Sequence, residues 1–203
     1  MTETILWDYP KSSASYRVRI ALNLAGIPYR TQSVDLLAGA HKSSDHIARN
    51  PQGLVPVLEI DGHRLTQSMA ILEYLDTTRD LGLLPASPVW RARVQAAAHC
   101  IAIDLHPVCN LSVMRHATGG QEPARTEWMQ HFIRPGLVAF EKMLEGLAAD
   151  GCPVLPSPSL MDLCLIPQLY NARRWGVSYN DLKRTMDIEA RCAADPAFVK
   201  AAP

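Results

Sequence analysis

The residues with the clearest chemical meaning are three serines within four positions near the start of the chain, Ser12, Ser13 and Ser15. A turn-forming segment, Tyr9-Pro10-Lys11, precedes them, and an apolar pattern of helical period follows. Hydroxyl groups and backbone N–H groups at the first turn of a helix can hold an anion, including a thiolate. The same cluster could serve turn chemistry alone. No G-x-S-x-G motif accompanies it, so a serine hydrolase is not indicated.

Two further segments could bind the polar parts of a ligand. Val55-Pro56 opens an apolar stretch, where a cis bond would turn the N–H and C=O of Val55 toward a peptide-like ligand. A trans proline at a strand edge is the alternative. Gln67-Ser68 begins a helical pattern, and its amide, hydroxyl and backbone N–H groups would converge on a carboxylate. An ordinary helix cap is the alternative for this pair.

A small unit with the order βαβαββα must position these residues. The alternating and apolar patterns predict strands over 5–8, 29–36, 55–60 and 63–65. Helical periodicity predicts helices over 12–25, 44–49 and 68–78. The opening strand–helix–strand unit favours a parallel pair of strands. Asp61-Gly62 then predicts a hairpin between the last two strands.

The remainder of the chain has a helical pattern and carries no strand signal. A linker at residues 79–88 contains Gly82, Pro85 and Pro88, so we expect one domain over 1–83 and an all-helical domain over 84–203. In the second domain, the sequence predicts an apolar helix face over 94–105. It also predicts a long helix over 123–149, which Pro135-Gly136 should bend or break. A further helix should begin at the capping box Ser159-Leu160-Met161-Asp162.

Composition excludes several classes of function. The chain has 203 residues, of which 48% are hydrophobic, and its formal net charge is zero. Neutrality gives no reason to expect nucleic acid or an anionic membrane as a partner, and no apolar run approaches the roughly 20 residues of a membrane helix. The five cysteines form no C-x-x-C pair and the histidines form no H-E-x-x-H. We therefore expect reduced thiols, no metal site and a cytoplasmic location.

Taken together, the motifs resemble the zeta class of glutathione transferases, which includes maleylacetoacetate isomerases and maleylpyruvate isomerases. The class signature S-S-C-x-x-R-V-R-I-A-L corresponds to residues 12–22, with Ala14 in place of the cysteine. The other matching blocks are Asn50-Pro51-Gln52-Gly53-Leu54-Val55-Pro56-Val57-Leu58, Gln67-Ser68-Met69-Ala70-Ile71-Leu72-Glu73-Tyr74-Leu75, Asn110-Leu111-Ser112-Val113, Asp162-Leu163-Cys164-Leu165-Ile166-Pro167-Gln168 and Asn171-Ala172-Arg173-Arg174. The resemblance covers nearly the whole chain.

The resemblance implies a two-domain α+β glutathione transferase fold, with a thioredoxin-like N-terminal domain and an all-α C-terminal domain, in a homodimer. It implies glutathione as cofactor, a cis Val55-Pro56 bond paired with its cysteinyl backbone, and its γ-glutamyl carboxylate on Gln67 and Ser68. It places His41 at the other end of the tripeptide. It places His106, Asn110, Leu111 and Ser112 near the pocket that glutathione shares with the substrate.

The implied activity is the cis–trans isomerisation of maleylacetoacetate to fumarylacetoacetate, in tyrosine and aromatic catabolism, by reversible thiolate addition. Because Ala14 replaces the cysteine of the class, the nucleophile must be glutathione itself. Ser12 is the expected main donor to its sulfur, supported by Ser13 and Ser15. Arg174, with Lys11 or Arg17, would meet the carboxylates of a dianionic substrate. Arg19 is expected on a solvated helix face.

Three alternatives stay open at this point. The protein could isomerise maleylpyruvate, whose pocket differs in one arm of the substrate. It could be a detoxifying transferase or an α-haloacid dehalogenase, in which glutathione is consumed or water replaces halide. It could also bind glutathione without turnover, a hypothesis that Ala14 favours and that Ser12, Gln67, Ser68 and Arg174 disfavour.

Overall fold

A computed structural model describes residues 3–152 and 158–203 of the chain. Two compact units are present. The first, here the sheet unit, comprises Met1–Leu81 together with Asp195–Pro203, and the second, here the helical unit, comprises Gly82–Ala194. The boundary near residue 82 agrees with the predicted linker. The division differs from the expected 84–203 domain at its end, because the last nine residues pack with the sheet unit.

The sheet unit contains four strands in the order β2-β1-β3-β4. The strands are β1 (Ile5–Asp8), β2 (Arg30–Ser33), β3 (Val57–Ile60) and β4 (His63–Thr66). β1 and β2 are parallel, with Ile5 opposite Arg30, whereas β3 is antiparallel to both β1 and β4. The predicted parallel pair and the Asp61-Gly62 hairpin are therefore confirmed, although β2 and β3 are shorter than the sequence pattern suggested.

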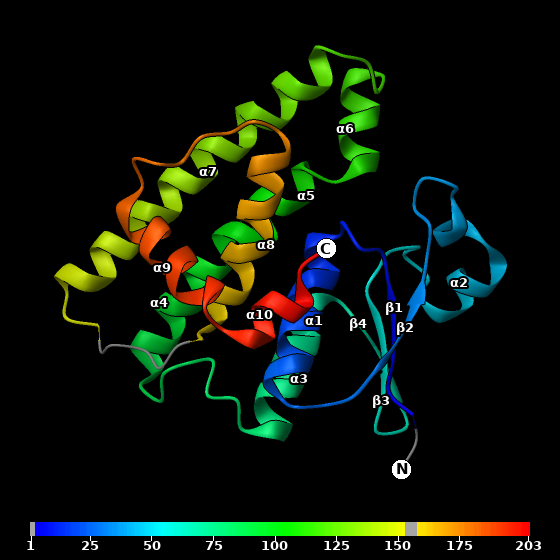
Figure 1. The fold of residues 1–203 in the computed structure, drawn as a ribbon, viewed down its shortest axis with the longest axis horizontal. Coiled ribbons are helices and arrows are strands. Elements are labelled where there is room, and N and C mark those ends of the chain that lie inside the picture. The colour runs from blue at the N-terminus through cyan, green and yellow to red at the C-terminus, as the bar shows by residue number, and fades with distance from the viewer. Residues whose placement is uncertain (1–2, 153–157) are drawn as a thin grey trace. The chain divides into compact units, whose positions relative to one another are not determined.

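Helices cover this sheet. They are α1 (Ser13–Leu24), the 3₁₀ turn η1 (Ala40–Lys42), α2 (Ser44–Arg49) and α3 (Ser68–Arg79), and the late helix α10 (Pro196–Ala201) joins them. Figure 1 shows α1 and α3 side by side on one face and α2 on the other. Leu6, Leu22, Leu58 and Leu72 are fully buried between the sheet and these helices. The element order βαβαββα predicted from the sequence is confirmed.

Arg19 ties α1 to three other segments of the sheet unit. Its Nη1 donates to both carboxylate oxygens of Asp8, at 2.9 and 2.7 Å. Its Nε donates to the carbonyl of Ala201 at 2.8 Å, and its Nη2 to that of Pro10 at 2.9 Å. The expectation that Arg19 lies on a solvated helix face is wrong, since the residue is 7% exposed. Its partners lie 11 and 182 positions away, so helical periodicity could not reveal them.

Substituting methionine for Arg19 is expected to destabilise the sheet unit by about 3–5 kcal/mol, because the buried carboxylate of Asp8 loses its partner. Urea unfolding measures the loss. The double variant R19M/D8L, which removes both charges, should recover most of it. The exposed pair Arg30–Glu3 provides the matched control, and Arg30→Met should leave the unfolding midpoint unchanged. An Arg19→Met protein as stable as the wild type would contradict the assigned role.

The helical unit consists of consecutive helices, as the sequence predicts. They are α4 (Pro88–His99), the π-helical segment η2 (Cys100–Leu105), α5 (His106–Val108), α6 (Leu111–Thr118), α7 (Ala124–Ala149), α8 (Leu160–Arg174) and α9 (Lys183–Ala193). The apolar face predicted over 94–105 thus spans two helix types, because the α-helix α4 is followed directly by the π-helix η2 at Cys100. Val94, Ala98 and Ile101 on this face are fully buried.

Two predictions about helix ends met different outcomes. Ser159 and Asp162 form the predicted capping box of α8, and the Ser159 N–H donates to the Asp162 carboxylate at 2.8 Å. By contrast, α7 does not break at Pro135-Gly136, where the sequence predicted a bend or a break; the helix continues through both residues. A Cβ on Gly136 would lie 2.7 Å from Leu105 Cδ2. This glycine therefore serves the close packing of η2 against α7 and does not end the helix.

Candidate functional site

Ser12 is the N-cap of α1 and presents its hydroxyl at the mouth of that helix. Its φ and ψ angles are −76° and 117°, and its Oγ accepts the N–H of Ser15 at 3.2 Å. A hydroxyl that accepts one bond in this way keeps its own hydrogen for another acceptor. Ser12 is partly exposed, whereas Ser13 is 7% exposed and Ser15 is fully buried. Ser12 is therefore the serine best able to donate to an anion from solvent.

Lys11, Ser13 and Ser15 lie around this hydroxyl in different environments. Lys11 is exposed in the turn before the helix. The Oγ of Ser15 has no hydrogen-bond partner among the described residues and is enclosed by the protein. Ser15 is thus enclosed by the protein and Ser13 nearly so, and the roles predicted for both stay predictions.

The loop before β3 is held by side chains of α2 and its C-cap. His46 Nε2 lies 3.0 Å from the carbonyl oxygen of Leu54, and Asn50 Nδ2 donates to the same oxygen at 2.9 Å. A carbonyl oxygen can only accept, so Nε2 of His46 is the donor in this contact. The Val55-Pro56 bond that follows is cis. His46 is not among the residues predicted from the sequence, although its spacing of four from Asn50 places both on one side of α2.

His41 lies close to this loop on η1. Gly53 adopts a φ of +63°, and a Cβ there would approach the His41 carbonyl oxygen to 3.2 Å. The loop and η1 are thus closely packed, and His41 itself is half-buried. Its predicted contact with the far end of a tripeptide stays a prediction.

The start of α3 forms the second polar centre of the sheet unit. Gln67 has a φ of +67°, a conformation that costs a non-glycine residue about 1–3 kcal/mol. Its Nε2 donates to Gln52 Oε1 at 2.7 Å, which links α3 to the loop before β3. Ser68, the first residue of α3, is 6% exposed. The arrangement places a side-chain amide, a hydroxyl and helix N–H groups together, as a carboxylate site requires.

Arg17 lies beneath this second centre. It was expected among the residues that contact a substrate carboxylate, but it is 1% exposed and donates from Nη1 to Ser68 Oγ at 3.0 Å. The structure therefore places its guanidinium behind Ser68 and away from the surface. α1 is consequently buried at both Arg17 and Arg19, which point to different sides of the helix.

The helical unit carries the other predicted site residues. Asn110 is the N-cap of α6, and its side chain makes no cap bond to the helix. Ser112 is exposed in the first turn of the same helix, and His106 begins α5. Asn110 and Ser112 are thus neighbours at one helix start. Their predicted contacts with a ligand stay predictions.

Arg173 and Arg174 are adjacent at the end of α8 but differ in their surroundings. Arg173 donates to the hydroxyl of Tyr179 at 2.7 Å and forms an ion pair with Glu189. Arg174 is exposed, and its guanidinium carbon lies 5.8 Å from the ring centroid of Tyr170. Within residues 3–152 and 158–203, no acidic side chain pairs with Arg174. Arg174 is accordingly the arginine of this pair whose charge is available to an anion.

Three of the protein thiols, Cys100, Cys109 and Cys152, are poorly suited to act as nucleophiles. Burial raises the pKa of the Cys109 thiol to about 12. Burial also raises the pKa of Cys100, with a further contribution from Asp104, and that of Cys152. A thiol with a raised pKa holds less thiolate at neutral pH. The chemistry of this chain is therefore better served by a sulfur supplied from outside, as Ala14 already indicates.

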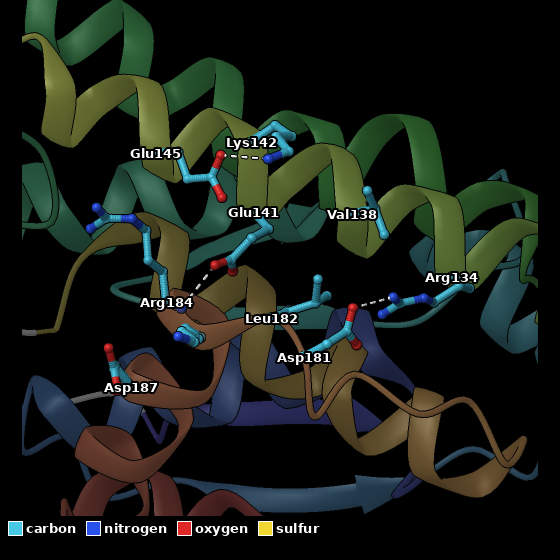
Figure 2. A pocket seen from close by; sticks show the side chains of 10 residues that line it. Arg134, Val138, Glu141, Lys142, Glu145, Asp181, Leu182, Arg184 and Asp187 are labelled. Atoms are coloured by element: carbon cyan, nitrogen blue, oxygen red, sulfur yellow. Dashed lines mark hydrogen bonds and ion pairs between the residues drawn. The ribbon is translucent and has the colours of Figure 1, made fainter.

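A charged groove of about 820 Å³ lies between α7 and the start of α9, but it contains none of the predicted site residues. Figure 2 shows the pairs Arg134–Asp181 and Lys142–Glu145 along it. Buried Glu141 accepts the N–H groups of Arg184 and Thr185, both at 2.9 Å. The Glu141 carboxylate thus caps the first turn of α9 from this groove.

A βαβαββα unit with the strand order β2-β1-β3-β4, joined to a unit of helices, defines a protein of the thioredoxin-like, glutathione transferase fold class. Residues 2–77 match the family described as glutathione S-transferase, N-terminal domain. The chain is 56% identical to the maleylacetoacetate isomerase of Rhizobium meliloti over 99% of its own length and 96% of the relative's. It is 39% identical to the maleylacetoacetate isomerase of Mus musculus, over 96% of its own length and 89% of the relative's.

Solved structures agree with these sequence similarities. The holo structure of a bacterial maleylpyruvate isomerase of the zeta class has a TM-score of 0.90 at 35% identity, covering 98% of this chain and 96% of that one. The maleylacetoacetate isomerase of Anaeromyxobacter dehalogenans 2CP-1 with bound glutathione has a TM-score of 0.85 at 38% identity, covering 99% and 95%. The chain belongs to the maleylacetoacetate isomerase family of zeta-class glutathione transferases. The fold class predicted from the sequence is confirmed.

Two other kinds of site are absent from the described part of the chain. No helix there is both long and apolar enough to cross a membrane. No group of three or more histidine, cysteine, aspartate or glutamate side chains there is arranged to hold a metal ion.

Proposed function

We propose that this protein is a glutathione-dependent enzyme that isomerises maleylacetoacetate to fumarylacetoacetate. The observation that carries the proposal is the 56% identity to a maleylacetoacetate isomerase along the whole chain, together with the Ser12 hydroxyl at the mouth of α1. Related structures contain glutathione with malonate, and dicarboxyethyl glutathione with citrate. A substrate with two carboxylates is consistent with those ligands.

The donors of the sheet unit fit glutathione. Ser12 offers a hydroxyl hydrogen at a helix start, the Val55 backbone precedes a cis proline, and Gln67 with Ser68 forms a carboxylate site. These groups match a thiolate, a peptide and a carboxylate respectively. Glutathione, when bound, would supply a thiolate. Its addition to the conjugated cis double bond would move the electron pair onto the oxygen of the adjacent ketone, and its departure after rotation would restore the double bond in the trans form.

The Ser12 hydroxyl must provide most of the stabilisation of that thiolate. A free thiol has a pKa of about 8.5, and lowering it by two units corresponds to about 2.7 kcal/mol. A hydrogen bond to a charged group contributes about 1.5–3 kcal/mol, whereas a helix N-terminus contributes about 0.3–1 kcal/mol. The hydroxyl therefore stabilises the thiolate more than the helix does. Arg174 balances a substrate carboxylate, which keeps the reacting arm in place while the bond rotates.

The enzyme divides its two ligands between its two units. The sheet unit binds glutathione and the helical unit binds the substrate. The enzyme is a cytoplasmic homodimer that acts in the breakdown of tyrosine and other aromatic compounds. The division of ligands, the location, the dimer and the metabolic role are proposed because the chain belongs to this family.

The test is an isomerisation assay with a small, substoichiometric amount of glutathione. We expect the cis substrate to be converted completely while the glutathione concentration stays constant, because the thiol is released in each turnover. Stoichiometric loss of glutathione would indicate a transferase. Binding of glutathione without conversion would indicate a binding protein, and halide release from α-haloacids would indicate a dehalogenase.

Maleylpyruvate is the second candidate substrate, favoured by the TM-score of 0.90 to a maleylpyruvate isomerase. The two substrates differ in one arm, so the ratio of their kcat/KM values measures the preference directly. A higher value for maleylpyruvate would replace the first proposal with the second.

A further inference from the structure

A buried cation lies behind the predicted carboxylate site. Arg17 of α1 donates from Nη1 to the Oγ of Ser68, the first residue of α3, at 3.0 Å. Both residues are buried, at 1% and 6% exposure. α1 and α3 pack along each other, so the contact is part of the rigid core of the sheet unit.

The contact fixes the direction of the Ser68 hydroxyl. A hydroxyl has one hydrogen and two acceptor sites, whereas a guanidinium can only donate. Ser68 Oγ must therefore accept from Arg17, and its own hydrogen is left for another acceptor. A hydroxyl that accepts from a cation is also polarised, which makes it a stronger donor. An anion is the acceptor that benefits most from such a donor.

We propose that Arg17 is a positioning residue, which holds Ser68 as a donor to the α-carboxylate of the γ-glutamyl group and places a positive charge behind it. This proposal rests on glutathione being the ligand of the proposed function. Ser68 Oγ lies 3.0 Å from Arg17 Nη1, so a carboxylate oxygen that accepts from Ser68 at an ordinary hydrogen-bond distance would lie up to about 6 Å from the guanidinium. At an effective dielectric constant of about 20, a unit charge at that distance changes affinity by up to roughly 100-fold.

The test compares two ligands by calorimetric titration, glutathione and its analogue that lacks the α-carboxylate. For Arg17→Met we expect the affinity for glutathione to fall about 10- to 100-fold and that for the analogue to change by less than about threefold. Ser68→Ala should show the same selectivity with a smaller effect. Arg64, an exposed arginine paired with Glu59, provides the control, and Arg64→Met should bind both ligands like the wild type.

Equal loss of affinity for both ligands in Arg17→Met and Ser68→Ala would overturn the proposal, because it would show a merely structural role. If Arg17→Met does not fold, Ser68→Ala, which keeps the cation in place, decides alone by the same criterion. The titrations contain no isomerase substrate. A wild-type protein that binds glutathione selectively but converts no substrate would therefore refute the proposed activity while leaving the role of Arg17 intact.

Discussion

Replacing Ser12 with alanine is expected to lower kcat/KM for isomerisation about 10- to 100-fold at neutral pH. The reason is that the hydroxyl supplies about 1.5–3 kcal/mol of the preference for the thiolate, and this preference sets the thiolate fraction. The pKa of bound glutathione, followed by the ultraviolet absorbance of the thiolate, should rise toward its value in free solution. At a pH above that value, the activity of Ser12→Ala should approach the wild-type activity.

The loss of the helix cap must be separated from the loss of the donor, since Ser12 also caps α1. Ser12→Thr keeps both functions and should retain most of the activity. Ser43 caps α2 in the same way, with its side chain accepting the N–H of His46. Ser43→Ala should therefore cost about 1 kcal/mol of stability without changing the pKa of bound glutathione. If the pKa of glutathione bound to Ser12→Ala equals that in the wild type, the hydroxyl does not have the assigned role.

Features that depend on neighbours along the chain could be predicted from the sequence. The serine cluster, the Asp61-Gly62 hairpin and the Ser159–Asp162 capping box each arise within a few residues, and all lie where expected. The bond between the Ser159 N–H and the Asp162 carboxylate spans only three positions. Burial raises the pKa of this carboxyl, a property of packing that the local motif does not contain.

Features that depend on distant partners could not be predicted. Arg17 and Arg19 have the composition of an exposed helix face, yet both are buried by partners that lie 51 and 182 positions away. The return of α10 to the sheet unit has no signal in its own residues, because it is fixed by Arg19 and by Asn23, whose amide donates to the Ala197 carbonyl at 2.9 Å. The burial of Arg17 and Arg19 therefore could not be predicted from the residues next to them in the sequence.

Replacing Arg174 with alanine is expected to lower kcat/KM for the dianionic substrate about 100- to 1,000-fold, mainly through KM. A charge-assisted contact between arginine and carboxylate contributes several kcal/mol where water is excluded, and its loss leaves the substrate charge unpaired. The unfolding midpoint should not change, since Arg174 is exposed and forms no ion pair with another described residue. Steady-state kinetics and urea unfolding on the same preparation check both statements.

The neighbouring arginine makes this test specific. Arg173→Ala removes the contacts with Tyr179 and Glu189, so it should lower stability slightly and leave kcat/KM within about threefold of the wild type. A substrate whose distal carboxylate is esterified should lose its dependence on Arg174, because the guanidinium then has no charge to balance. If Arg174→Ala slows the ester and the dianion equally, the arginine acts on the fold of α8 and not on a carboxylate. If Arg173→Ala shows the larger kinetic loss, the anion is bound by the other arginine.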